Sequence, residues 1–102
     1  MCGICGYYTY NRETTVNLSS LIKKMTDTLT HRGPDDEGYF CSKNVALGHR
    51  RLSIIDLKGG KQPIYNEDKT KVIVFNGEIY NYKEIQKHLK TKGHCFKTNS
   101  DT

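Results

Sequence analysis

Apolar residues at helical spacing predict one helix in the first third of the chain and another in the last third. The first is expected over residues 18 to 29, where apolar side chains form one stripe and Asn17 can cap the start. The second is expected from the cap Asn81 through Lys90, with Glu84 completing a capping box and Gly93 ending the helix. Both apolar stripes are interpreted as faces that pack against a core.

Short β-forming segments before and between the helices predict strands and hairpins. The expected strands are residues 3 to 10, 39 to 41, 45 to 49, 64 to 65, 71 to 75 and 94 to 98. The second and third of these are expected to pair as one hairpin, and the fourth and fifth as another. Residues 52 to 57 are predicted to be a buried extended segment.

Glycine and proline mark the breaks between these elements. The segment His31 to Gly38 (HRGPDDEG) contains Gly33-Pro34 and then three acids, so it is predicted to be a loop. At Asn76-Gly77, directly after the most apolar strand, a turn with unusual backbone angles is expected. A chain of 102 residues can form one domain or part of one. We expect one domain over residues 1 to 102, truncated before its C-terminal half.

Composition and charge narrow the class of protein. The chain is 35% hydrophobic and 10% aromatic, with a mean hydropathy of -0.70, which argues for a folded chain with a modest core. It has no apolar run of the roughly 18 residues needed to cross a bilayer and no export signal, so a cytoplasmic location, no membrane partner and reduced cysteines are expected. The formal charge of +5 comes from scattered lysines, so no nucleic-acid partner is expected.

Cys2 is the most distinctive chemical feature of the sequence. Once Met1 is removed, Cys2 carries a thiol and a free α-amine on one residue, and the amine can accept the proton of the thiol. Position alone does not separate such a nucleophile from an incidental cysteine, because a reactive cysteine also needs an oxyanion stabiliser.

Cys2 and Cys5 also form a C-x-x-C pair, which could indicate a redox site or half of a zinc site. Both are disfavoured, since no strand precedes the pair and the only other closely spaced ligands are the adjacent His94-Cys95. Cys5 is instead interpreted as a small buried residue, and no metal site is expected.

Three further positions each allow a structural and a functional interpretation. Asn76-Gly77 could be a simple turn, or could present an amide and a backbone N–H to a developing oxyanion. Arg51 could be a solvated cation or a bidentate partner for a carboxylate. Asp101 could be a surface acid or the partner of an ammonium group. The acids Asp35 to Glu37 are interpreted as solvated, not as metal ligands.

Six motifs, in this order, resemble the N-terminal glutaminase domain of class II glutamine amidotransferases. They are most similar to the branch of glutamine-hydrolysing asparagine synthetases, within the N-terminal-nucleophile hydrolases. The motifs are MCGICG at 1 to 6, HRGPDDEG at 31 to 38, GHRRLSIIDL at 48 to 57, KQPIYN at 61 to 66, VFNGEIYNY at 74 to 82 and NSDT at 99 to 102. Together they cover the length of the chain.

The resemblance implies a role for each site residue. Cys2 corresponds to the nucleophile that attacks the side-chain amide of L-glutamine, with its own α-amine as the base. Asn76 and Gly77 correspond to the oxyanion hole, Arg51 to the partner of the substrate carboxylate and Asp101 to the partner of its ammonium group. The remaining implied pocket residues are Leu52, Ser53, Ile54, Ile55 and Glu78.

The resemblance also implies a fold, a reaction and a partner. The fold would be the N-terminal portion of an αββα sandwich with mostly antiparallel sheets. The reaction would be hydrolysis of glutamine to glutamate and ammonia, with no cofactor in this domain. The ammonia would pass to a synthetase domain or subunit that uses ATP and magnesium. A non-catalytic remnant and a small zinc- or nucleic-acid-binding module stay open as alternative functions.

Overall fold

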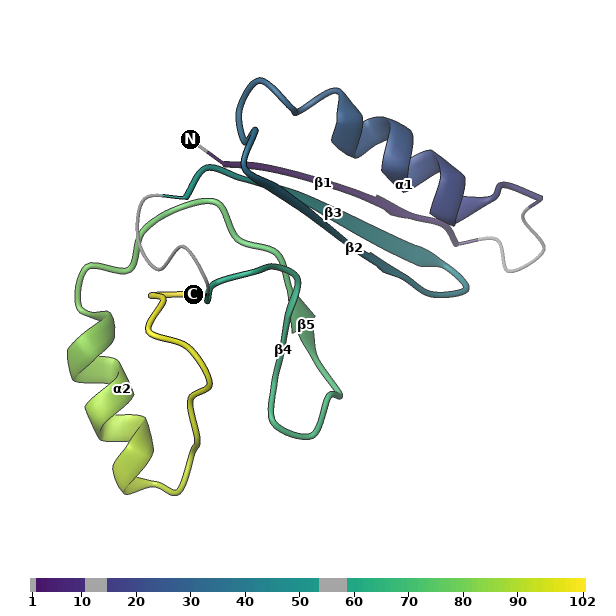
Figure 1. Cartoon of the computed structure of the whole chain (residues 1–102). Helices are drawn as coiled ribbons and strands as arrows, with labels where there is room; N and C mark the ends of the chain where they lie inside the picture. Colours follow the sequence, from purple (N-terminus) through teal and green to yellow (C-terminus); the bar gives the residue numbers. More distant parts are fainter. Residues whose placement is uncertain (1, 11–14, 54–58) are drawn as a thin grey trace.

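The computed structural model describes residues 2 to 10, 15 to 53 and 59 to 102. The described chain is a mixture of helices and antiparallel strands (Figure 1). In chain order, its elements are β1 (Gly3–Tyr8), α1 (Leu18–Asp27), β2 (Asp36–Cys41), β3 (Val45–Arg51), β4 (Ile64–Tyr65), β5 (Val72–Ile73) and α2 (Tyr82–Thr91). The α+β class expected from the sequence is confirmed at this level.

The first half of the chain is a three-stranded antiparallel sheet covered by α1. The strand order is β1-β3-β2, so β3 lies in the centre. The register pairs Gly3 with Arg50, which brings the start of β1 beside the end of β3. We call β1, β2, β3 and α1 together the covered sheet.

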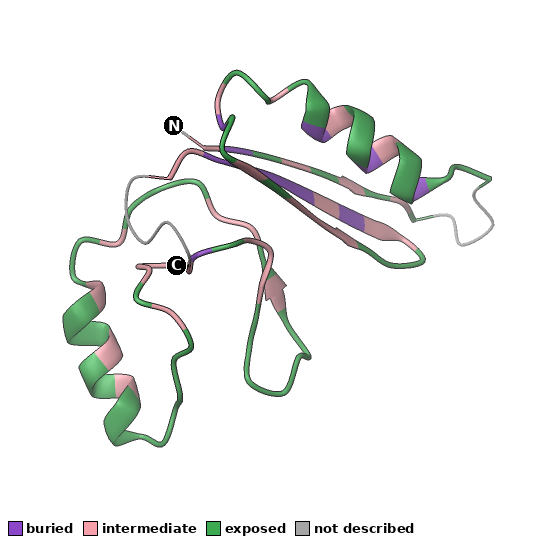
Figure 2. Cartoon of the chain, viewed as in Figure 1, coloured by how far each residue is buried: buried purple, intermediate pink, exposed green. Residues whose placement is uncertain are grey.

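Helix α1 packs its apolar stripe on one face of that sheet. Leu18, Ile22 and Thr26, spaced four residues apart, are buried, and the first two form a core with Ala46 of β3 (Figure 2). The buried Thr26 hydroxyl donates to the Ile22 carbonyl at 2.7 Å, so its polarity is satisfied within the helix. The predicted cap is confirmed, because Asn17 Oδ1 accepts from the backbone N–H of Ser20 at 3.1 Å.

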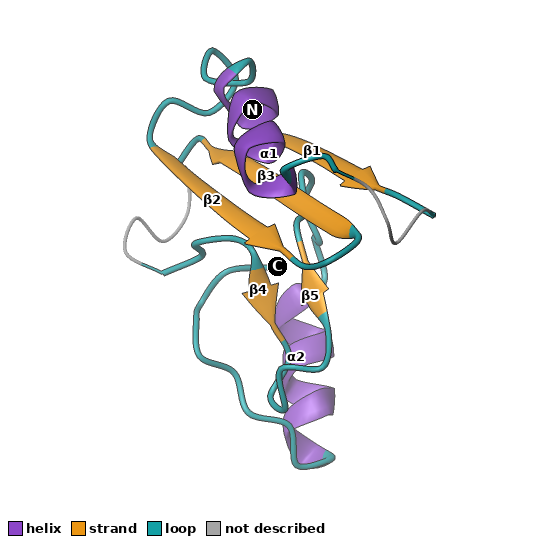
Figure 3. Ribbon diagram, turned by 90° about the vertical axis from the view of Figure 1, so that its right-hand side faces the viewer, coloured by secondary structure: helices purple, strands orange, loops and turns teal. Residues whose placement is uncertain are grey.

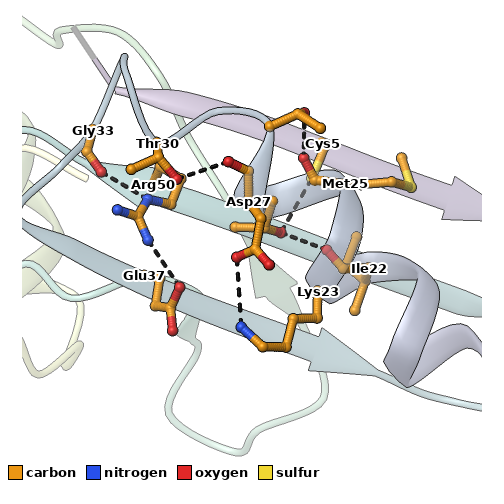
Figure 4. Close-up of polar contacts among 11 residues, drawn as sticks. Cys5, Ile22, Lys23, Met25, Asp27, Thr30, Gly33, Glu37 and Arg50 are labelled. Atoms are coloured by element: carbon orange, nitrogen blue, oxygen red, sulfur yellow. Dashed lines mark hydrogen bonds and ion pairs between the residues drawn. The ribbon is translucent and has the colours of Figure 1, made fainter.

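Alternate residues of β3 face opposite sides of the sheet. Gly48 faces α1 so closely that an added Cβ would lie 2.1 Å from Thr26 Oγ1. Arg50 faces the same side, where its guanidinium donates to the Gly33 carbonyl and to Glu37, each at 2.8 Å (Figure 4). His49, which lies between Gly48 and Arg50, therefore faces the side away from α1.

The second half of the chain, residues 59 to 102, lies on that other side of the sheet (Figures 1 and 3). It holds the β4–β5 hairpin and α2, and α2 buries none of its residues. The backbone of Gln62 passes so close to β2 that a Cβ added at Gly38 would lie 1.8 Å from the Gln62 carbonyl oxygen. Only glycine fits at this contact between the two halves.

Most predicted elements are confirmed, with bounds that differ by a few residues: the first strand, the first helix and the fifth strand are shorter than predicted, and the second and third strands are longer. The first strand ends at Tyr8 and the first helix at Asp27, and both predicted hairpins form. Gly93 ends α2 with a φ of +92°, as predicted for a helix stop. The predicted extended segment at 52 to 57 falls mainly outside the described residues. Neither helix of the described chain is long and apolar enough to cross a membrane.

The loop predicted at His31 to Gly38 is wrong at its end, because β2 already begins at Asp36. Asp36 and Glu37 pair with Arg51 and Arg50 of β3, and the Glu37–Arg50 ion pair stabilises that extension. A local pattern of acids and glycine does not reveal pairing with a distant strand.

Three further local predictions are wrong. Asn81 precedes α2 but makes no side-chain cap hydrogen bond, since its backbone (φ −97°, ψ 26°) is not extended. Gly77 does not have the left-handed backbone expected there, and an added Cβ would lie 2.8 Å from the tip of the Phe75 ring. Residues 94 to 98 form no strand; the backbone N–H of His94 donates to the Leu89 carbonyl at 3.2 Å and that of Cys95 to the Glu67 carboxylate at 3.4 Å.

Candidate active site

A pocket of about 100 Å³ lies where the start of β1 and the end of β3 meet the second half of the chain. Both halves contribute to its walls. The lining residues are Cys2, His49, Arg51, Leu52, Gly60, Gln62, Phe75, Gly77, Glu78, Ser100, Asp101 and Thr102. Six of these, namely Cys2, Arg51, Leu52, Gly77, Glu78 and Asp101, are positions that the sequence indicated.

Backbone and side-chain contacts hold Cys2 on this pocket. The backbone N–H of Leu52 donates to Cys2 Sγ at 3.3 Å, and the Leu52 carbonyl lies 3.7 Å from the same sulfur. Arg32 Nε donates to the Cys2 carbonyl at 3.1 Å. The thiol therefore has both a hydrogen-bond donor and an acceptor from one residue, and it can be accommodated with or without its proton.

Cys5 lies on the other side of β1. Its Sγ is 3.4 Å from Thr26 Oγ1 of α1, and its side chain packs against the core. Figure 4 shows Cys5 between β1 and the helix. Cys2 instead lines the pocket beyond the opposite face of the sheet. The two thiols of the C-x-x-C pair thus lie on opposite faces of the sheet. The described residues contain no group of three potential metal ligands.

Arg51 places a buried positive charge in the pocket. Its side chain stands at the end of β3 and the residue is 6% exposed. Gly60 adopts a φ of +63°, and an added Cβ there would lie 3.0 Å from Arg51 Nη2. The left-handed glycine allows the chain after residue 59 to lie directly against the guanidinium.

The opposite charge comes from the second half of the chain. Asp101 Oδ2 accepts from the backbone N–H of Ile79 at 2.8 Å, which holds residues 100 to 102 against the segment after Gly77. Gly77 and Glu78 line the pocket beside it. One cavity therefore contains a thiol, a guanidinium and a carboxylate from separate parts of the sequence.

The structure does not bring every indicated residue to the pocket. Asn76 is exposed and is not among the lining residues. Ser53 lies outside the lining, with its backbone N–H donating to Asp35 Oδ2 at 2.8 Å. Ile54 and Ile55 lie outside the described residues.

Gln62 and His49 are pocket residues that the sequence did not indicate. Gln62 accepts from the Phe75 backbone and lies 3.5 Å from Thr102 Oγ1, so it joins three segments of the pocket wall. His49 stands two residues before Arg51 on the same strand, and that period-2 spacing was the available signal.

Burial lowers the pKa of His49 below the ordinary histidine value, and the nearby positive charge of Arg51 lowers it further. The Phe75 backbone and the Asp36 carboxylate oppose this pKa decrease without cancelling it. His49 is therefore a neutral imidazole near pH 7.

Comparison with known proteins identifies the family. Residues 1–102, the whole chain, match the family model described as a glutamine amidotransferase domain. The chain belongs to this family. As a glutamine amidotransferase domain, it is 48% identical over 103 residues to asparagine synthetase [glutamine-hydrolyzing] 1 of Bacillus subtilis (strain 168), covering 100% of this chain and 16% of that relative. It is 46% identical to the Zea mays asparagine synthetase [glutamine-hydrolyzing], covering 99% of this chain and 17% of the relative.

The glutamine amidotransferase domain therefore spans about a sixth of the length of the relatives it matches. Its pocket suits a small zwitterion that also carries an electrophilic carbonyl. The guanidinium of Arg51 complements a carboxylate, the carboxylate of Asp101 complements an ammonium group, and the thiol of Cys2 can attack a carbonyl carbon.

Proposed function

We propose that this domain hydrolyses L-glutamine to glutamate and ammonia, with Cys2 as the nucleophile. The observation that carries the proposal is the shared pocket of Cys2, Arg51 and Asp101. Glutamine presents an α-carboxylate, an α-ammonium group and a side-chain amide, one group for each of the three. Family membership supports the same substrate.

The first chemical step uses both functional groups of an N-terminal Cys2. After removal of Met1, the free α-amine takes the thiol proton, and the thiolate attacks the amide carbon of glutamine. The tetrahedral oxyanion collapses to a thioester as the protonated amine returns its proton to the leaving ammonia. Water then hydrolyses the thioester to glutamate and the free thiol. The Leu52 N–H, 3.3 Å from the sulfur, supports the thiolate before attack.

The oxyanion would be stabilised by Gly77 and Asn76. Gly77 lines the pocket and can present its backbone N–H without a side chain in the way. Asn76 is the adjacent residue, and we propose that its exposed side chain rotates into the pocket when glutamine binds. Leu52, Ser53, Ile54, Ile55 and Glu78 complete the proposed substrate site.

We further propose that the ammonia serves an amidation catalysed by another domain. The relatives are named as glutamine-hydrolysing asparagine synthetases, so the proposed acceptor partner is a synthetase domain that forms asparagine with ATP and magnesium. This domain itself would need no cofactor. A cytoplasmic location suits the four cysteines, all of which are free thiols.

The proposed fold is the N-terminal portion of an αββα sandwich of the N-terminal-nucleophile hydrolase type. Part of that layering supports it: α1 covers one face of the three-stranded sheet, and the β4–β5 hairpin lies on the other side, where the Tyr65 ring meets the Phe40 ring of β2 (Figure 3). Among the described residues, α2 packs against neither sheet. Cys2, directly before β1, lines the pocket on the side of the sheet away from α1, as the proposed fold requires of its nucleophile.

A glutaminase assay on the intact protein tests the nucleophile. Cys2→Ala is expected to lower the rate of glutamate release by roughly a thousandfold or more, because the thioester can no longer form. Cys5→Ser is the matched control, since Cys5 contacts α1 and not the pocket, and it should retain most activity. Equal activity in the Cys2→Ala protein would refute the proposal.

The free amine requires a separate experiment. Mass spectrometry of the active protein should find Cys2 as the first residue. A variant that keeps one extra residue before Cys2 should bind glutamine yet release no glutamate, because its α-amine is an amide and no longer a base. Full turnover by that extended protein would contradict the free-amine mechanism while leaving Cys2 as the nucleophile.

A further inference from the structure

His49 is a buried polar group in the pocket that the proposed reaction does not use. The residue is 1% exposed, lies in the wall with Cys2 and Gly77, and comes from the central strand of the covered sheet. Its Nε2 atom is buried and has no hydrogen-bond partner among the described residues. An unsatisfied buried polar atom is costly, so it marks a position where a ligand or a water molecule can bind.

The hydrogen-bonding character of Nε2 follows from the rest of the ring. A neutral imidazole has one nitrogen that donates and one that accepts. The Phe75 backbone raises the pKa of the His49 ring, as a carbonyl that accepts from a ring N–H does. Since Nε2 has no partner among the described residues, we assign this N–H to Nδ1. Nε2 therefore carries an unused lone pair inside the pocket wall, which a bound ligand reaches when the wall shifts on binding. The group that it needs is an N–H or O–H donor.

Glutamine and its hydrolysis product differ at just this point. The side-chain amide of glutamine has an NH₂ group with two donors, whereas the carboxylate of glutamate only accepts hydrogen bonds. A buried acceptor attracts the amide and repels the carboxylate. We propose that His49 is a specificity residue whose Nε2 accepts a hydrogen bond from the substrate's amide NH₂, favouring glutamine over glutamate and helping to expel the product.

This inference depends on the proposed glutaminase function, and binding measurements separate the two. In the intact Cys2→Ala protein, which cannot turn over, calorimetry gives the affinities for L-glutamine and L-glutamate. His49→Leu in that background should reduce the preference for glutamine over glutamate by roughly tenfold, the size of one net hydrogen bond. His49→Gln, which can keep an acceptor there, should restore most of the preference.

A matched control is His88→Leu, an exposed histidine on α2 outside the pocket, which should leave both affinities unchanged. If His49→Leu weakens both ligands equally, or neither, the specificity role is refuted. If the parent Cys2→Ala protein binds no glutamine, the proposed function itself fails.

A second measurement requires no substitution of His49, and so does not depend on how such variants fold. The experiment is ¹⁵N NMR of Cys2→Ala protein labelled at histidine. When glutamine is added, the resonance of the unprotonated His49 nitrogen should move upfield, because its lone pair then accepts a hydrogen bond. Glutamate should not produce that shift. The same shift with both ligands, or with neither, would overturn the inference.

Discussion

The two halves of the chain are packed very differently. In the covered sheet, α1 buries Leu18 and Ile22 against Ala46, and the strands run for six or seven residues. In the second half, β4 and β5 have two residues each, and α2 buries none of its residues (Figure 2). Its Ile85 is 41% exposed. The covered sheet is therefore an ordered platform, and we use that word for it below. The second half is expected to unfold locally at a lower free-energy cost than the platform.

The pocket is lined by residues from both the well-packed half and the loosely packed half of the chain. Arg51 is fixed by strand pairing in the covered sheet, and Cys2 is held directly before β1 by hydrogen bonds to Leu52 and Arg32. Gly77 and Asp101 come from the loosely packed half. A ligand that contacts Arg51 and Asp101 together would connect the two halves. Substrate binding is therefore expected to stabilise the second half more than the first.

The largest expected effect compares the same substitution in the two helices. Ile22→Ala should lower the free energy of unfolding by about 3 kcal/mol, because Ile22 is 1% exposed and its loss leaves a cavity in the core. Ile85→Ala, at a half-exposed site on α2, should cost less than about 1 kcal/mol. Urea denaturation of the two variants measures both values, and equal costs would contradict the packing difference.

The contact between the halves can be disrupted at Gly38. Gly38→Ala would place a Cβ against the backbone of Gln62, and relief of that overlap should cost about 2 kcal/mol. Gly6→Ala is the matched control, since its Cβ would meet the flexible Leu47 side chain at 3.2 Å. Hydrogen exchange should then rise in residues 62 to 79 of the Gly38 variant and stay unchanged in α1. Exchange that rises uniformly would show that the halves unfold as one unit.

The two charges in the pocket test whether both halves hold the substrate. Arg51→Lys loses the bidentate geometry and should raise KM for glutamine by roughly tenfold with a smaller change in kcat. Asp101→Asn should raise KM similarly with little change in Tm, because the Asn oxygen can still accept from the Ile79 N–H while the negative charge is lost. A normal KM in the Asp101 variant would place substrate recognition on the platform alone.

The smallest expected effect concerns the helix caps. Asn17→Ala removes the hydrogen bond to Ser20 and should destabilise the platform by about 1 kcal/mol. Asn81→Ala removes no such bond from α2 and should change stability by less than about 0.5 kcal/mol. Thermal denaturation of both proteins would show the difference, and a larger loss for Asn81 would reverse the ranking of the two helices.

Local sequence signals predicted the elements that local interactions determine. The stripe of α1, the Asn17 cap and the Gly93 stop depend on residues a few positions apart, and all three are confirmed. The start of β2 at Asp36 depends on pairing with Arg51, which is distant in sequence. The acidic HRGPDDEG pattern therefore predicted a loop where the strand begins. The predicted strand at 94 to 98 is also wrong: the Cys95 backbone N–H donates to Glu67, which is distant in sequence, and that of His94 donates to Leu89 at the end of α2.

The pocket shows the same division. Cys2, Arg51, Gly77, Glu78 and Asp101 were found because they lie in recognisable motifs, and the structure brings all five to one cavity. Gln62 and His49 were missed since their roles depend on the close approach of chain segments that are distant in sequence. The exposed position of Asn76 could not be inferred from a motif, which indicates chemistry but not the rotamer of a side chain in the unliganded protein.

The contact between Cys2 and Leu52 has a consequence for any saturation mutagenesis of this protein. The sulfur meets the main-chain N–H and carbonyl of position 52, not its side chain. Most replacements there keep both main-chain groups, so their effects would report the Leu52 side chain in the pocket and not this contact with the sulfur. Only proline, which lacks the N–H, would reveal the dependence. Sequence variability at residue 52 would thus understate how much the nucleophile relies on it.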